Sequence, residues 1–136
     1  MSPAGAAGTP ITFQQGIAFP EICEGRLTTE SGVPNSTSDR SSQGTLFWTP
    51  SNPSGVATTI GYVTLYNGTL LVALGLTQLS LGLTVTSAKN YDVFMDYNGG
   101  TPQLVLSAAW TDDATRADAL GVQSGLVVKS GTPAYR

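Results

Sequence analysis

The chain has 136 residues, of which 40% are hydrophobic and 11% charged, with a net charge of −3; this is enough for one domain that buries roughly two thirds of its unfolded surface. The low charge makes nucleic acid and anionic membranes poor partners. No apolar run approaches the ~20 residues of a membrane helix, and the N-terminus lacks the features of a signal peptide, so we expect a soluble protein that is not exported by the usual route.

The composition favours strands joined by turns over helices. The 16 glycines, 8 prolines and many Ser and Thr residues accompany short bursts of β-branched and aromatic residues, which are typical of strands. We predict a mainly β fold: an antiparallel β-sandwich or jelly-roll-like barrel with one short helix and an extended N-terminal arm. The arm comprises residues 1–20 and the β-sandwich domain residues 21–136.

The arm is rich in Gly, Ala and Pro, and its apolar residues follow no sustained period. Such a segment buries too little surface to offset its ordering entropy by itself, but it can order against a neighbouring subunit. Ile11, Phe13, Ile17 and Phe19 are therefore predicted subunit contacts. The alternative is a tail without a structural role or a cloning remnant.

The first half of the domain begins with two strand signals. EICEGRLTTESG alternates imperfectly, with Gly25 as a candidate bulge, and ends in the turn signal Ser31-Gly32. After a polar loop, TLFWTP is a short aromatic strand that Pro50 closes.

Two further signals follow. IGYVTLY and TLLVALG flank Asn67-Gly68, which predicts a tight hairpin over residues 60–75. The next segment predicts a half-buried strand, because its apolar residues recur at strict period two, at Leu79, Leu81, Leu83 and Val85.

KNYDVFMDYNGGTPQLVLSAAW is the most regular stretch and predicts a second hairpin, with strands at 91–97 and 103–110. Apolar residues occur on both faces of its second strand, which indicates cover on both sides by another sheet or another subunit. Leu106 and Trp110 are therefore predicted subunit contacts, with burial in the domain core as the alternative. A last strand is expected around Leu126 to Lys129.

TDDATRADALG interrupts the β pattern. Thr111 or Asp112 can cap a helix, the acidic residues lie in the first turn, where the helix dipole favours them, and Gly121 is placed to end it. We predict one short helix here, with Arg116 paired to Asp112 or Asp113.

The residues needed for catalysis are largely missing. The chain contains no histidine, which removes the Ser-His, Cys-His and His-metal arrangements. The single cysteine, Cys23, is expected to be a small buried apolar side chain. Asp92 and Asp96 share a strand face about 13 Å apart, which is too far for a glycosidase pair, so a solvated face is expected. DYNGG begins like a calcium loop but lacks the closing Glu. We predict no enzymatic activity, no cofactor and no metal site.

The segments CEGRLTTESG, LYNGT, LSLGLT and KNYDVFMDYNGGTPQLVLSAAWTDDATRADALGVQSGLVVKSG occur in order over residues 21–131. Together they resemble a module that recurs in structural proteins of tailed bacteriophages. The resemblance implies a virion setting and no catalytic residues. This chain stops at SGTPAYR, where related chains continue through an Arg/Tyr-rich segment, which favours a stand-alone unit.

Two functions follow as expectations. The first is a capsid decoration, or cement, protein, made in the bacterial host cytoplasm, that binds the outer shell as a homotrimer. Its partners would be the major capsid protein or tail proteins. The alternative is a receptor- or carbohydrate-binding module associated with a tail fibre or spike, which would recognise a host surface glycan through exposed aromatic rings and polar loops.

Overall fold

The computed structural model describes residues 21–97 and 100–132, and the regular structure in these ranges consists of antiparallel β-strands. The predicted arm, residues 1–20, lies outside the described residues. The strands are β1 (Gly25–Thr28), β2 (Thr45–Pro50), β3 (Gly61–Tyr66), β4 (Leu71–Leu76), β5 (Leu79–Gly82), β6 (Val93–Asp96), β7 (Gln103–Leu106), β8 (Leu120–Gln123) and β9 (Leu126–Lys129). The prediction of a mainly β fold is confirmed.

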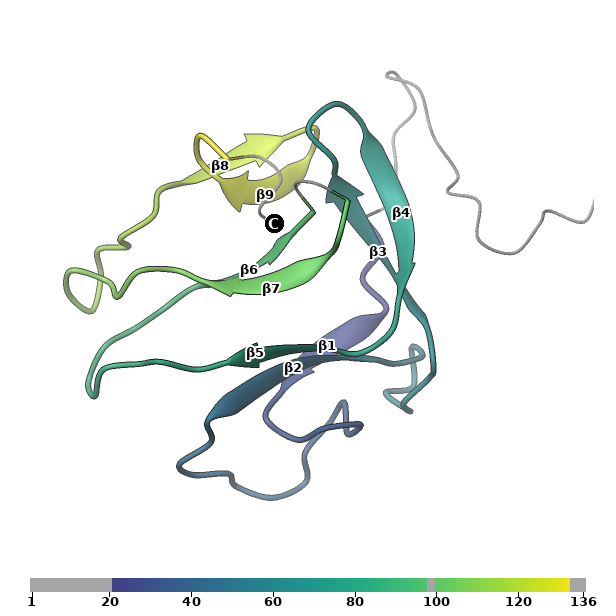
Figure 1. The fold of residues 1–136 in the computed structure, drawn as a ribbon, viewed down its shortest axis with the longest axis horizontal. Coiled ribbons are helices and arrows are strands. Elements are labelled where there is room, and N and C mark those ends of the chain that lie inside the picture. Colours follow the sequence, from purple (N-terminus) through teal and green to yellow (C-terminus); the bar gives the residue numbers. More distant parts are fainter. Residues whose placement is uncertain (1–20, 98–99, 133–136) are drawn as a thin grey trace, which may run out of the picture.

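The strands form small sheets. β2 lies between β1 and β5, while β3–β4, β6–β7 and β8–β9 are hairpins. In Figure 1 the β1-β2-β5 sheet and the β6–β7 hairpin face each other, and β3–β4 runs along one end. Within the described ranges the strands do not close into a barrel, and no helix there is long and apolar enough to cross a bilayer.

The hydrophobic core lies between these sheets. Its buried side chains come from β2, β3, β4, β6 and β7, and they are Trp48, Val63, Leu65, Leu76, Met95 and Leu104. Leu79 and Leu81 of β5 pack against this cluster from the side, while Ser80 and Gly82 face solvent. The period-two prediction therefore holds over β5. Val85 is an exception, because the strand ends at Gly82 and the side chain of Val85 is exposed.

The turn of the first predicted hairpin forms as its sequence indicates. The Asn67 side-chain oxygen accepts hydrogen bonds from the backbone N–H groups of Thr69 and Leu70, and Gly68 takes a positive φ of 96°. A side chain that bonds its own backbone two and three residues later, followed by a residue that tolerates positive φ, makes a local turn signal. The register of β3 and β4 follows from this turn.

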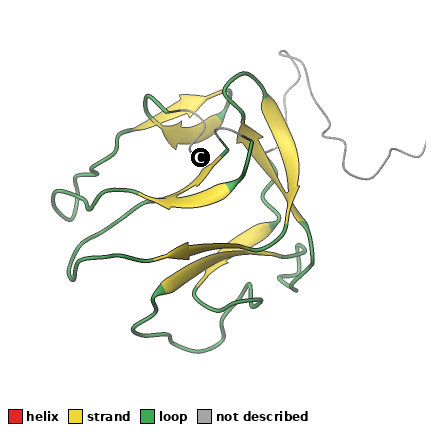
Figure 2. Ribbon diagram, viewed as in Figure 1, coloured by secondary structure: helices red, strands yellow, loops and turns green. Residues whose placement is uncertain are grey.

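The predicted helix at residues 111–121 is wrong, and no helix occurs in the described residues (Figure 2). Asp112 does act like a cap, since its carboxylate accepts from the N–H groups of Ala114 and Thr115, and these bonds hold its pKa below the usual range. However, the Thr111 N–H donates to the Thr115 carbonyl, which closes a loop instead of a helical turn. A helical segment this short nucleates poorly by itself, and β8 takes Leu120 and Gly121 into a hairpin with β9.

Candidate functional site

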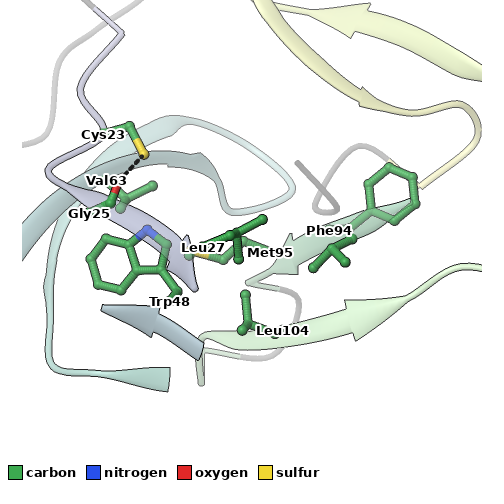
Figure 3. A pocket seen from close by; sticks show the side chains of 9 residues that line it. Cys23, Gly25, Leu27, Trp48, Val63, Phe94, Met95 and Leu104 are labelled. Carbon is green, nitrogen blue, oxygen red and sulfur yellow. Dashed lines mark hydrogen bonds between the residues drawn. The ribbon is translucent and has the colours of Figure 1, made fainter. Parts of the chain in front are cut away.

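A pocket of about 240 Å³ lies beside β1, between β2 and the β6–β7 hairpin (Figure 3). Its lining is almost entirely apolar and comes from strands β1, β2, β3, β6 and β7 and from Cys23, which lies two residues before β1. The lining residues are Cys23, Gly25, Leu27, Trp48, Val63, Val93, Phe94, Met95 and Leu104. Apolar lining with few polar atoms is typical of a site that takes an apolar group.

Trp48 is the largest side chain of this pocket, and its indole ring lies against Gly25. A Cβ atom at position 25 would lie 2.7 Å from the indole Nε1 and closer still to the ring carbons, so the indole packs directly on the glycine backbone. The indole is buried, and its Nε1–H has no hydrogen-bond acceptor within the described part of the chain. A buried donor without an acceptor is rare in folded proteins, and it marks this site as unusual.

The predicted burial of Cys23 is wrong. Cys23 forms an isolated bridge with Val63 of β3, and its side chain stands exposed at the rim of the pocket. The thiol lies 3.8 Å from the carbonyl oxygen of Gly25, a weak contact that leaves it accessible.

A polar cluster fastens the loop after β7 to the strand region before β6. The Trp110 Nε1–H donates to Asp92 Oδ2 at 2.9 Å, and Arg116 Nε donates to Asp92 Oδ1 at 3.2 Å. The Arg116 guanidinium also lies over the Trp110 ring, 4.6 Å from its centroid. The predicted pairing of Arg116 with Asp112 or Asp113 is therefore wrong, because without a helix these carboxylates do not align with it.

The predicted solvated face for Asp92 and Asp96 is also wrong. Asp96 is only 3% exposed, and its carboxylate accepts from the Gln103 side chain, the residue directly opposite on β7. The Asp92 side chain is 18% exposed beside Trp110. Asp96 is buried and Asp92 half-buried, and each has a polar partner, which is the condition under which acidic groups leave water.

The predicted subunit contacts fall in two groups. Ile11, Phe13, Ile17 and Phe19 lie outside the described residues. Leu106 and Trp110 are half-buried, Leu106 opposite Val93 and Trp110 beneath Arg116. Neither is fully in the core, and their role as subunit contacts stays a prediction.

The β8–β9 hairpin presents an exposed apolar face. Sequence reasoning missed it, because the helix predicted at residues 111–121 overlaps the start of β8. Val122 and Val127 are directly opposite in the register, and they are 74% and 58% exposed; Leu120 is on the same side. Leu126 and Val128 point the other way and are buried. The signal for this hairpin is present in the sequence, because Ser124-Gly125 separates two strand-like segments and both residues take positive φ, as a tight hairpin turn requires.

No protein-family model, curated protein or solved structure matches this chain. Among the described residues there is no group of three or more Cys, Asp or Glu side chains placed to hold a metal ion.

Proposed function

We propose that this protein is a structural protein of a tailed-bacteriophage virion, a capsid decoration or cement protein that works by binding other subunits. The observation that carries the proposal is the apolar outer face of β8–β9, where Leu120, Val122 and Val127 are exposed side by side. An apolar face on an edge hairpin suits a contact with another protein better than it suits water. The resemblance of residues 21–131 to a phage structural module points to the same setting.

In this proposal the domain is a β-sandwich that assembles as a homotrimer on the major capsid protein, with residues 1–20 reaching over neighbouring subunits. It binds through many weak contacts, which symmetry multiplies into high avidity. The protein has no enzymatic activity of its own, and neither nucleic acid nor a membrane is its partner. It is made in the host cytoplasm and resides on the capsid exterior.

One observation supports the alternative of a receptor- or glycan-binding module on the tail. Tyr62 is about half exposed, and its ring lies over Gly75 of β4, where a Cβ atom would come within 3.3 Å of ring carbon Cε1. A flat exposed ring of this kind can stack on a sugar. The apolar face of β8–β9 has no place in that function, so the decoration role is the better supported of the two.

The copy number per virion tests the proposal and separates the two functions. Quantitative mass spectrometry of purified particles measures the ratio of this protein to the major capsid protein. A ratio near one supports decoration. A far smaller ratio, which corresponds to a few copies per particle, supports the tail. Absence from purified particles contradicts both.

Substitutions on the β8–β9 face test the decoration proposal directly. The double variant Val122→Asp/Val127→Asp should lose capsid binding, whereas Val56→Asp, an exposed control, should keep it.

A further inference from the structure

β1 is bonded to a neighbouring strand along one side only. The Glu24 carbonyl accepts from the Ser51 N–H at 3.1 Å, and hydrogen-bonded pairs alternate along an antiparallel ladder. Arg26 and Thr28 therefore bond across to β2, while the backbone groups of Gly25 and Leu27 point to the outer side.

The other side of the ladder agrees with this assignment. Gly25 is opposite Pro50, which has no N–H to donate, and the Pro50 carbonyl accepts from the Thr58 N–H at 3.0 Å instead of facing β1. Leu27 is opposite Trp48, whose backbone groups bond to β5. The Leu27 N–H and carbonyl thus have no partner among the described residues, and they form an open strand edge.

The apolar pocket lies beside this open edge. Gly25 and Leu27 line it from β1, Trp48 forms its wall, and Met95 and Leu104 lie across from them (Figure 3). A dry cavity of about 150 Å³ holds a benzene molecule, so a pocket of about 240 Å³ accommodates an aromatic side chain. An open edge next to an apolar pocket is the arrangement by which proteins bind an extended segment as an added strand.

We propose that the β1 edge and its pocket bind residues 11–19 of a second copy of this chain as an added strand. This segment, ITFQQGIAF, is uncharged, as the pocket lining is. Its pairs Ile11/Phe13 and Ile17/Phe19 have the i, i+2 spacing that places both side chains on one face of a strand. In this pairing the phenyl ring of Phe13 fills the pocket while the backbone bonds to Leu27.

The structure favours a second copy over the chain's own segment. A hairpin that pairs residue 19 directly with Gly25 has its turn in residues 20–24, and residues 22–24 would have to leave β3 to make that turn. Those residues are already bonded to β3: Ile22 and Thr64 exchange hydrogen bonds, Cys23 bridges Val63, and the Glu24 N–H donates to the Tyr62 carbonyl. A second copy has no such restriction, and a head-to-tail contact of this kind builds a ring or a chain of subunits. The inference rests on the self-association and the arm of the proposed function and deepens them, because it names the surface that the arm binds. Its test uses the free protein, so its failure is distinct from the absence of the protein from purified particles.

The experiment uses the full chain and two complementary variants, measured by sedimentation velocity over a dilution series. Phe13→Asp removes the inserted side chain but leaves the β1 edge intact. Leu27→Pro removes the outward N–H but no bond between β1 and β2, a position where an edge strand tolerates proline. Val85→Asp, an exposed apolar residue away from the pocket, is the control.

The wild type and Val85→Asp should associate as concentration rises, whereas each complementary variant by itself should sediment as one copy. Mixing the two should restore a complex of two copies, because the segment of Leu27→Pro binds the intact edge of Phe13→Asp. This recovery also shows that the Phe13→Asp domain is folded. A cooperative thermal melt checks the Leu27→Pro domain, and Leu27→Asp replaces it if the proline variant does not melt cooperatively. A monomeric wild type, variants that associate as the wild type does, or a mixture that stays monomeric overturns the proposal.

Discussion

At the scale of single residues, Gly61 shows how closely the backbone segments approach one another. A Cβ atom there would overlap the carbonyl oxygen of Glu24 and lie 3.2 Å from Pro50 Cβ, and a backbone atom cannot rotate away as a side chain can. Gly61→Ala should therefore lower the free energy of unfolding by about 1–3 kcal/mol, as overpacking does. Chemical denaturation measures this change.

Gly121 is the matched control for Gly61. It also lies in a strand, but a Cβ atom there would meet the Ser130 Cα at 3.8 Å, an ordinary contact. Gly121→Ala should change the free energy of unfolding by no more than about 0.5 kcal/mol. Equal effects of the two substitutions would show that the approach of Glu24 to Gly61 is loose.

Asp92 should contribute more to stability than its ionic partner. Asp92→Ala removes the acceptor of the Trp110 N–H, a hydrogen bond to a charged group, and should cost about 1.5–3 kcal/mol. Arg116→Ala should cost less than about 1 kcal/mol, because the Arg116 side chain is 45% exposed and solvent screens its pairing. Thermal or urea unfolding of both variants gives the order, with Asp113→Ala as the exposed control. A larger loss for Arg116→Ala contradicts this account.

At the scale of elements, what could be predicted from the sequence depended on local chemistry. β2 ends at Pro50, β9 covers Leu126–Lys129, and the Asn67-Gly68 turn joins β3 to β4, because each of these signals acts within a few residues. β8 was missed because Asp112 and Gly121 imitate the two ends of a helix. The local signal was ambiguous, and the pairing with β9 decided the outcome.

The candidate site was less predictable than the strands. The pocket joins Gly25, Trp48, Met95 and Leu104, residues far apart in the sequence, and only the three-dimensional arrangement brings them together. Similarly, the burial of Asp96 depends on Gln103 across the hairpin. No period or motif in a single sequence encodes such long-range pairs.

The β8–β9 hairpin has one buried and one exposed face, and substitutions should separate them. Leu126 is 2% exposed, so Leu126→Ala should cost about 2–5 kcal/mol through lost burial and a residual cavity. Val127→Ala, on the adjacent outward position, should change stability by about 0.5 kcal/mol or less. Thermal unfolding of the two variants measures the difference, and a similar loss from both would mean that the outer face is covered within the free protein.

At the scale of the whole molecule, several small sheets share one core, and their stabilities should differ. β2 is bonded to strands on both sides and carries Trp48 into the core, so its amides open only with the whole domain. β8 and β9 bond to each other as an isolated pair, and a two-stranded hairpin has little stability of its own. Local opening then requires less free energy at β8–β9 than at β2.

Amide hydrogen exchange tests this ranking. In the native protein, the amides of Leu46, Phe47, Trp48 and Thr49 should exchange slowest, at rates set by global unfolding. Those of β8 and β9 should exchange faster, through local opening that leaves β2 protected. Added denaturant should accelerate exchange in β2 strongly and in β8–β9 weakly, because the two openings expose different amounts of surface. Uniform rates and a uniform denaturant response would show that the hairpin and the central sheet unfold as one cooperative unit.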